Sequence, residues 1–321
     1  MKTLRPAIFV LLAALLVTAV SCGPDRKDVS DSPGKITVVT TLFPLYDLTR
    51  AIAGDRATVT LILPPGVEAH TFEPKPGDMA RVDSAQLFVY TGRYMEPWSE
   101  ELLKGVANKT LITVDASRGI RLMKSGGEHH TGGGKEHGHG HHDHGAYDPH
   151  IWMDLGNAMT MVDTITEGLC AADPRGSDLF RKNATDYKER LSRLDGKFRE
   201  ALGTCRKKTL IHGGHFAFGY LAHRYGLEYV SAYEGSPNAE PTARKIIALK
   251  KKMDENGIRY VYFEELINPK VSELLARETG ATLLYLHGAH NLTKDEFEKG
   301  ATFISLMENN LENLRKGLEC R

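Results

Sequence analysis

Short apolar runs rich in β-branched residues alternate with longer amphipathic stretches from Lys35 to the end of the chain. Runs of this kind predict strands, and the stretches between them predict helices. The predicted strands are residues 36–40, 58–63, 86–91 and 110–114 in the first half, and residues 208–212, 227–233, 259–265 and 282–286 in the second. Strands that alternate with helices favour parallel sheets. We therefore expect an α/β protein with two lobes, each a mainly parallel sheet flanked by helices.

One long amphipathic stretch, residues 178–202, separates the two halves. Its apolar side chains recur near helical spacing, and charged residues occupy many of the other positions. The apolar positions are Leu179, Phe180, Tyr187, Leu191, Leu194 and Phe198. At about 1.5 Å per residue this helix is about 35 Å long. We expect it to be a rigid connection between an N-terminal lobe, residues 35–177, and a C-terminal lobe, residues 203–321.

The chain begins with a short apolar segment. Lys2 and Arg5 precede an apolar stretch at residues 7–20, and Cys22 follows after a small residue. The apolar stretch is shorter than the roughly 20 residues that a membrane-spanning helix needs. A charged start, an apolar middle and a small residue before cysteine are typical of a signal for export.

This segment resembles a bacterial lipoprotein signal, with Ala19 where leucine is usual. The resemblance implies a signal peptide at residues 1–21 and lipid attached to Cys22. Residues 22–34 are polar and we expect them to form a flexible tether. The protein would then be exported and held at the membrane only by its lipid, on the periplasmic face or the cell surface.

Charge and cysteine content exclude some classes of protein. The chain has 41 Lys and Arg against 41 Asp and Glu, so nothing indicates a nucleic-acid or anionic-lipid partner. The cysteines other than Cys22 are odd in number and widely spaced, which excludes a zinc ribbon. Cys205 and Cys320 are a candidate disulfide because they flank the C-terminal lobe, but pairings with Cys170 stay open.

A glycine-spaced, histidine-rich run occupies residues 128–147 and holds half of the histidines. A spacer has no need of histidine, so we favour a transition metal as its ligand. We expect a disordered loop that captures several ions weakly, since ordering such a segment on a metal costs conformational entropy. The histidines concerned are His129, His130, His137, His139, His141, His142 and His144.

Four other histidines suggest a stronger site. His70, His215 and His287 each follow a predicted strand, where open α/β sheets place their ligands, and His150 follows the histidine-rich run. A single loop histidine is more often a surface residue or a helix cap. Two from each predicted lobe, however, could supply the four donors of tetrahedral zinc in a cleft between the lobes.

Five segments together resemble a known family. They are PPGVEAHTFEPKPGD, DPHIWMDLGNA, HGGHFAFGYLAHRYGL, Glu240–Pro241 and FISLMENNLENL, in the family's order over residues 35–318. They are similar to the metal-binding receptors of bacterial zinc and manganese ABC importers, the ZnuA/TroA type. The resemblance implies two α/β lobes joined by one long helix, with the metal at the lobe interface.

The resemblance also implies a ligand set. It places the first three ligands on His70, His150 and His215. Many members have an aspartate or a water as fourth ligand, and counting back from Leu292 puts His287 at the aspartate's place. His290 lies three residues further on and is the alternative.

Other polar residues could support the site or replace a ligand. We expect His212 to hydrogen-bond locally or to orient a ligand, and Glu68 to be a solvated loop residue that could add a carboxylate. Glu240 belongs to the same group of supporting candidates. Phe72 and Trp152 adjoin proposed ligands and could form a dry wall around the metal or belong to the ordinary core. Imidazole donors favour Zn²⁺, whereas Mn²⁺ prefers oxygen and is the weaker candidate.

These expectations give a functional hypothesis: a monomeric high-affinity zinc receptor that delivers its metal to an ABC importer permease. A zinc-storage or adhesin lipoprotein on the same fold and a manganese receptor are the alternatives. A zinc hydrolase is disfavoured, because the sequence has no HExxH motif and shows no carboxylate fixed beside two ligands. We therefore do not expect an enzyme. The stiff connecting helix predicts small tilts of the lobes rather than wide hinge closure.

Overall fold

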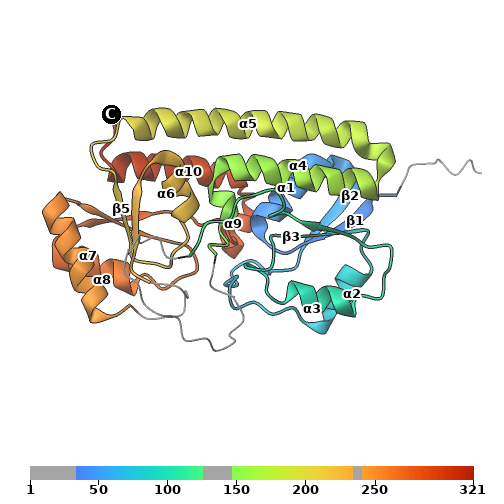
Figure 1. Ribbon diagram of the computed structural model, residues 1–321, viewed down its shortest axis with the longest axis horizontal. Coiled ribbons are helices and arrows are strands. Elements are labelled where there is room, and N and C mark those ends of the chain that lie inside the picture. The colour runs from blue at the N-terminus through green and yellow to red at the C-terminus, as the bar shows by residue number, and fades with distance from the viewer. Residues whose placement is uncertain (1–33, 126–146, 234–240) are drawn as a thin grey trace, which may run out of the picture. The chain divides into compact units, whose positions relative to one another are not determined.

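The structure, a computed structural model, describes residues 34–125, 147–233 and 241–321 (Figure 1). The expected signal peptide, Cys22 and most of the tether lie outside the described residues, as do the seven histidines of the histidine-rich run and Glu240. The described residues from Lys35 to Arg321 form one compact unit. Among the described residues, no helix combines the length and apolar character needed to cross a membrane.

The N-terminal lobe contains a four-stranded parallel sheet in the order β2-β1-β3-β4. Its strands are β1 (Ile36–Thr40), β2 (Ala57–Leu61), β3 (Leu87–Tyr90) and β4 (Ile112–Asp115). Its helices are α1 (Phe43–Ala53), α2 (Pro76–Asp83), α3 (Ser99–Gly105) and α4 (Leu155–Ala172), with short 3-10 turns η1 (Gly54–Arg56), η2 (Ile151–Met153) and η3 (Pro174–Gly176).

The C-terminal lobe repeats this arrangement, with parallel strands in the order β6-β5-β7-β8. Its strands are β5 (Thr209–His212), β6 (Glu228–Ser231), β7 (Tyr260–Phe263) and β8 (Thr282–Tyr285). Its helices are α6 (Gly219–Tyr225), α7 (Ala243–Asn256), α8 (Lys270–Thr279), α9 (Lys294–Glu298) and α10 (Phe303–Gly317). The predicted fold class and all eight predicted strands are confirmed, and the strand ends differ from the prediction by no more than two residues.

Each sheet has one face toward its own outer helices and one toward a core that both lobes share. In the N-terminal lobe, Val82 of α2 and Leu102 of α3 pack on Phe88. In the C-terminal lobe, Met253 of α7 and Leu275 of α8 belong to the corresponding outer layer. The inner faces and the helices α1, α4, α5, α6 and α10 contribute to a single continuous cluster of buried side chains. Separating the lobes would expose this cluster to water, so the hydrophobic effect holds them together.

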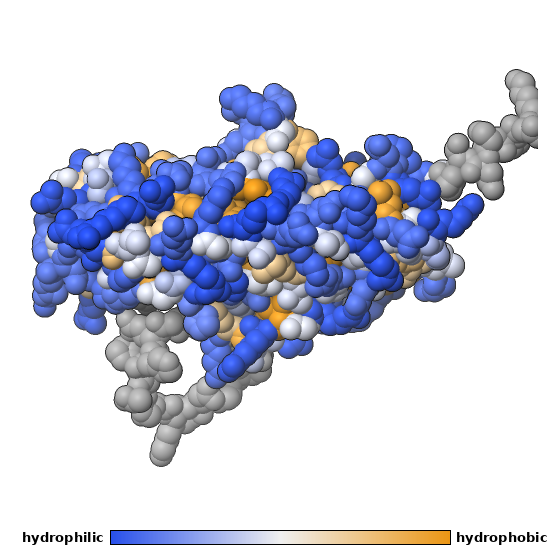
Figure 2. Space-filling model, turned by 90° about the horizontal axis from the view of Figure 1, so that it is seen from above, coloured by the Kyte–Doolittle hydropathy of each residue, from blue (hydrophilic) through white to orange (hydrophobic). Residues whose placement is uncertain are grey.

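The long helix α5 spans Ser177–Gly203, one residue longer at each end than predicted, and runs along both lobes (Figure 1). Its buried stripe begins at Phe180 and continues to Leu202, whereas Leu179 lies outside it with an exposed fraction of 40%. The prediction that Leu179 belongs to the apolar face is therefore wrong. Viewed from the side of α5, the surface is mostly hydrophilic (Figure 2).

A buried carboxylate ties this helix to both lobes. Asp47 of α1 accepts hydrogen bonds from the Tyr187 hydroxyl of α5, at 3.2 Å, and from the Phe303 backbone N–H of α10, at 2.9 Å. A carboxylate at the N-terminus of α10 also interacts favourably with the helix dipole. Because burial raises the pKa of Asp47, these donors are needed to keep its charged form stable.

A disulfide joins Cys205, just after α5, to Cys320, just after α10, and Cys170 is free. The candidate pairing is thus confirmed. It closes a loop of 115 residues and links the end of the connecting helix to the chain's C-terminus. A crosslink over so long a loop restricts the unfolded chain strongly.

We predict that Cys320→Ser lowers the free energy of unfolding by about 2–4 kcal/mol, because the unfolded chain regains the entropy that the crosslink removes. Urea unfolding with and without a reductant measures this. Cys170→Ser is the control and leaves the urea midpoint unchanged. Equal midpoints for wild type and Cys320→Ser under oxidising conditions would contradict the prediction.

Candidate metal centre

Four imidazoles converge between the lobes. They belong to His70 and His150 of the N-terminal lobe and to His215 and His290 of the C-terminal lobe, and their candidate ligand atoms all lie within 4.8 Å of one another. The Nε2 atom of His150 is 3.2 Å from Nε2 of His70 and 3.3 Å from Nε2 of His215. Two nitrogens bound to one tetrahedral zinc at about 2.0–2.1 Å are separated by about 3.3 Å. The two separations from His150 therefore match those of a zinc site, and the whole cluster lies within reach of one ion.

His70 is set by a turn that follows β2. The Glu68 carboxylate accepts hydrogen bonds from the backbone N–H groups of His70 and Thr71, each at 2.9 Å. Glu68 thus fixes the loop backbone and uses both of its oxygens to do so. This local role explains its position without any contact with the metal.

His150 begins the turn η2, which leads into α4. The Asp148 carboxylate lies 2.6 Å from Nδ1 of His150 and also accepts a hydrogen bond from its backbone N–H. His215 has the same arrangement with Glu264, whose carboxylate is 2.8 Å from Nδ1 and accepts the backbone N–H at 2.9 Å. A carboxylate on Nδ1 fixes the tautomer and leaves Nε2 available as a ligand.

The fourth imidazole of the cluster is His290, the alternative to the expected His287. Nδ1 of His290 is 3.2 Å from the Glu265 carboxylate, and its buried Nε2 has no hydrogen-bond partner among the described residues. Three of the four imidazoles therefore have a carboxylate behind them on the Nδ1 side and direct Nε2 toward the cluster. His287 is absent from the cluster.

The backbone conformation between the two histidines accounts for the difference. Ala289 has a positive φ of 57°, a left-handed conformation that is uncommon outside glycine. Gly288 packs against the His290 ring, since a Cβ atom there would lie 2.5 Å from Cε1 of His290. The Gly288 carbonyl accepts the Trp152 indole N–H at 2.7 Å. This turn brings His290 to the cleft, although His287 is closer to the end of β8.

His287 instead forms a buried ion-pair group behind the cluster. Its Nδ1 is 3.3 Å from Glu265 and its Nε2 is 3.5 Å from Glu296. Burial disfavours the charged imidazole, but the two carboxylates outweigh burial and raise the pKa of His287 to about 9. Hydrogen bonding to His287 lowers the pKa of Glu296 to about 2. Nδ1 of His287 also accepts a hydrogen bond from the Ala289 backbone N–H at 2.8 Å, so the group anchors the loop that carries His290.

The remaining candidates lie around the cluster. Nδ1 of His212 is 3.1 Å from the His215 carbonyl oxygen and from the Tyr229 hydroxyl, so His212 supports the turn before His215. The Trp152 ring contacts the rings of His150 and His290 and closes one side of the site.

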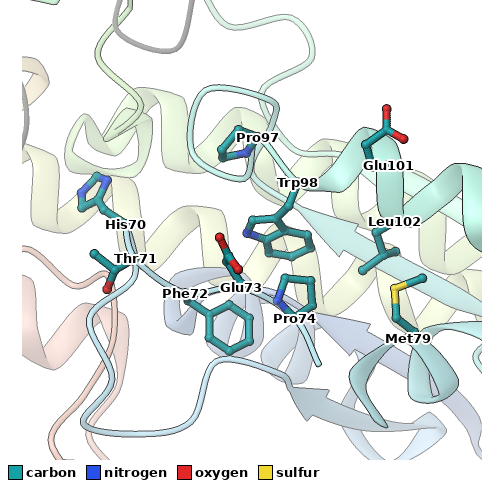
Figure 3. Close-up of a pocket in the computed structure, with 10 residues that line it drawn as sticks. All are labelled: His70, Thr71, Phe72, Glu73, Pro74, Met79, Pro97, Trp98, Glu101 and Leu102. Atoms are coloured by element: carbon teal, nitrogen blue, oxygen red, sulfur yellow. The ribbon is translucent and has the colours of Figure 1, made fainter. Parts of the chain in front are cut away.

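Phe72 lies beside Trp98 in a pocket of about 460 Å³ that borders His70 (Figure 3). Glu73 is exposed and lines the same pocket. His70 is the one partly exposed imidazole of the cluster, so an ion could approach from this side.

Electrostatics distinguish the four imidazoles. Burial and the neighbouring rings hold the pKa values of His70 and His150 well below 6.5, so both are neutral at physiological pH. For His215, burial lowers the pKa, but the Glu264 carboxylate outweighs it and the pKa is raised. Neutral imidazoles are the form that binds a cation.

The sequence analysis did not identify Asp148, Glu264 and Glu265 as carboxylates beside the ligands. One signal was available, because Glu264 and Glu265 directly follow the apolar strand β7. All three carboxylates contact the Nδ1 side of an imidazole, away from the converging Nε2 atoms. They are therefore placed to orient ligands rather than to activate a metal-bound water.

We predict that the His287 group makes stability depend on pH in the metal-free protein. Because the folded pKa of about 9 exceeds the unfolded value near 6.5, the stabilisation is complete below pH 6.5 and is lost as the pH rises through 9. Its size is about 3 kcal/mol. Urea unfolding in excess chelator at pH 6–9.5 should show this loss in wild type and not in His287→Gln. Parallel pH profiles for the two proteins would rule the prediction out.

Comparison with known proteins is consistent with this site. Residues 38–317 match the model of the family described as zinc-uptake complex component A, periplasmic. The high-affinity zinc uptake system protein ZnuA of Bacillus subtilis is 38% identical over 312 residues, which are 97% of each chain.

Solved structures share the fold. The Zn(II)-bound ZnuA-like domain of Streptococcus pneumoniae AdcA is 34% identical, with a TM-score of 0.75 over 89% of this chain and all of that one. The laminin-binding protein Lmb of Streptococcus agalactiae, described as bifunctional with adhesin and metal-transporting activity, is 27% identical, with a TM-score of 0.75 over 88% of this chain and 99% of that one. The expected resemblance is confirmed, and this chain belongs to the ZnuA family of periplasmic zinc-uptake components.

Proposed function

We propose that this protein is an exported receptor that binds one zinc ion with high affinity and delivers it to the permease of an ABC importer. The ion would be held by Nε2 of His70, His150, His215 and His290. The observation that carries the proposal is the convergence of four imidazoles within 4.8 Å, with His150 at the nitrogen separations of a tetrahedral zinc site from His70 and His215. Membership of the ZnuA family supports the transport role.

The donor set favours zinc over manganese. Four imidazole nitrogens face the centre of the cluster, whereas the nearby carboxylates are engaged on the outer side. Manganese prefers carboxylate and water oxygens, and zinc accepts an all-imidazole tetrahedron. Asp148, Glu264 and Glu265 increase the basicity of the ligands and offset the charge of the bound cation.

The location of the site suits a carrier. Each lobe contributes two ligands, so a bound ion bridges the lobes and a small relative tilt would break the tetrahedron. Docking of both lobes on a permease could supply that tilt and release the ion. Lipid attached to Cys22 would keep the receptor close to the membrane.

The histidine-rich run has a separate role in this proposal. Seven histidines spaced by glycine would collect zinc weakly and raise its concentration near the receptor. The adhesin and storage alternatives share the zinc site and differ in needing no permease. Growth under chelation distinguishes them, since only a transport receptor would be required for zinc uptake.

We predict that His290→Ala weakens zinc binding by more than about 100-fold, since loss of even an outer-shell partner costs roughly 10–100-fold. His287→Gln, the matched comparison three residues away, should weaken zinc binding less, because His287 supports the loop of His290 and is not a proposed ligand. Calorimetric zinc titration of the metal-free proteins measures both. The opposite order of effects would restore His287 as the ligand and contradict the proposed set.

We also predict that deleting residues 129–144 removes only weak sites and keeps one tight site, because none of the four proposed ligands lies in that run. Calorimetry at increasing zinc concentration counts the two kinds of site. Cells that lack other zinc importers should grow under chelation with this deletion but not with His290→Ala. Loss of the tight site in the deletion would move the receptor site to the histidine-rich run.

A further inference from the structure

We propose that Arg224 is a positioning residue for the zinc site and sets the separation of His150 and His215. This inference rests on the proposed zinc function. Arg224 touches none of the four imidazoles, and it acts through the three helices that it joins. The side chain belongs to α6 and meets carboxylates on α4 and α5.

The contacts of Arg224 are short and directional. Its Nε and Nη2 donate to the two oxygens of Asp195 on α5, at 2.7 and 2.8 Å. Its Nη1 donates to Asp154 at the start of α4, at 2.6 Å. The exposed fractions of the three side chains are 13–16%, so water screens these ion pairs less than it screens surface pairs. A guanidinium that binds one carboxylate with both arms has a fixed orientation.

Asp154 couples this contact to His150. Its carboxylate also accepts the backbone N–H groups of Gly156 and Asn157, and it thereby caps α4. Only the turn η2 separates Asp154 from His150. A displacement of the start of α4 is therefore transmitted to His150 through three residues of regular structure.

A second contact of α6 holds the other side of His150. The Tyr220 hydroxyl donates to the Asp148 carbonyl at 3.2 Å and accepts the Met123 backbone N–H at 2.9 Å. Asp148 is the residue that orients the His150 ring. Helix α6 is thus bonded to the chain both before and after His150.

The same helix follows His215 closely in the chain. Phe218 and Tyr220 near its start are buried, so the segment from His215 into α6 packs as one body. Arg224 and Tyr220 consequently fix this body against the segment that contains His150. These contacts therefore set the distance between Nε2 of His150 and Nε2 of His215, which is 3.3 Å.

Gly156 shows how closely the guanidinium packs on α4. A Cβ atom at this position would lie 2.5 Å from Nη1 and 3.1 Å from Cζ of Arg224. Alanine is otherwise favourable in the first turn of a helix. The same Cβ would lie 3.0 Å from the Asp154 carboxylate, so Gly156→Ala disturbs the contact between Arg224 and Asp154 without removing any charge.

The test measures zinc affinity of the purified protein by competition with a chelator strong enough to leave the weak sites empty. The variants are Arg224→Gln, Arg224→Lys and Gly156→Ala. Arg199→Gln is the matched control. Arg199 bonds the same Asp195 carboxylate, at 3.1 Å, but it lies on α5 together with Asp195 and so joins no second helix. The melting temperature of each metal-free protein and the visible absorption of its Co²⁺ form are recorded in parallel.

We expect Arg224→Gln and Gly156→Ala to bind zinc about 10–100-fold more weakly than wild type, the range found for residues that orient ligands. Arg224→Lys should recover part of the loss, and Arg199→Gln should match wild type. The visible Co²⁺ absorption bands of the weakened variants should be less intense than those of a regular tetrahedral site. A loss of stability alone would not change these bands in a protein that is still folded.

Wild-type zinc affinity and Co²⁺ spectra in Arg224→Gln and Gly156→Ala would overturn the inference and leave the proposed function intact. An equal loss in Arg199→Gln would overturn it as well, because that result assigns the effect to the charge of Asp195. Absence of tight zinc binding in wild type would instead refute the proposed function, and the inference with it.

Discussion

The convergence of four imidazole nitrogens from two separate lobes is the constraint on which the rest of this structure depends. A tetrahedral ion tolerates errors of only about 0.5 Å in its ligands, so the lobes have to be fixed against each other. Neither lobe can complete the site, since each supplies two of the four histidines. The shared apolar core, α5 along both lobes and the bonds of Asp47 all restrict movement at this interface.

The same constraint explains the charged groups that surround the site. Four histidines placed within 4.8 Å of one another would repel each other if they were protonated. Burial keeps His70 and His150 neutral, whereas carboxylates on the outer side hold the Nδ1 atoms of His150, His215 and His290. These carboxylates determine which nitrogen faces inward. Glu265 contacts both His290 and the buried His287, and these contacts stabilise the loop that carries His290.

The sequence predicted the features that follow from periodicity and chain order. Eight apolar runs became eight strands, and the spacing of apolar residues identified α5. His70, His150 and His215 were brought together as expected. His287 was preferred to His290 because it follows a strand and because the resemblance placed it at the family's aspartate position. The left-handed backbone at Ala289 is a tertiary feature with no signal in local composition. Leu179 fitted the apolar spacing of α5 and is nevertheless exposed, because burial of a helix position depends on which other elements pack against it.

Anomalous diffraction at the zinc edge, from crystals of protein loaded with one equivalent of zinc, tests the central claim most directly. The account predicts one peak between the lobes, about 2.0–2.1 Å from Nε2 of His70, His150, His215 and His290. A peak beside His287 and Glu296, or a peak that lacks ligands from one of the two lobes, would contradict it.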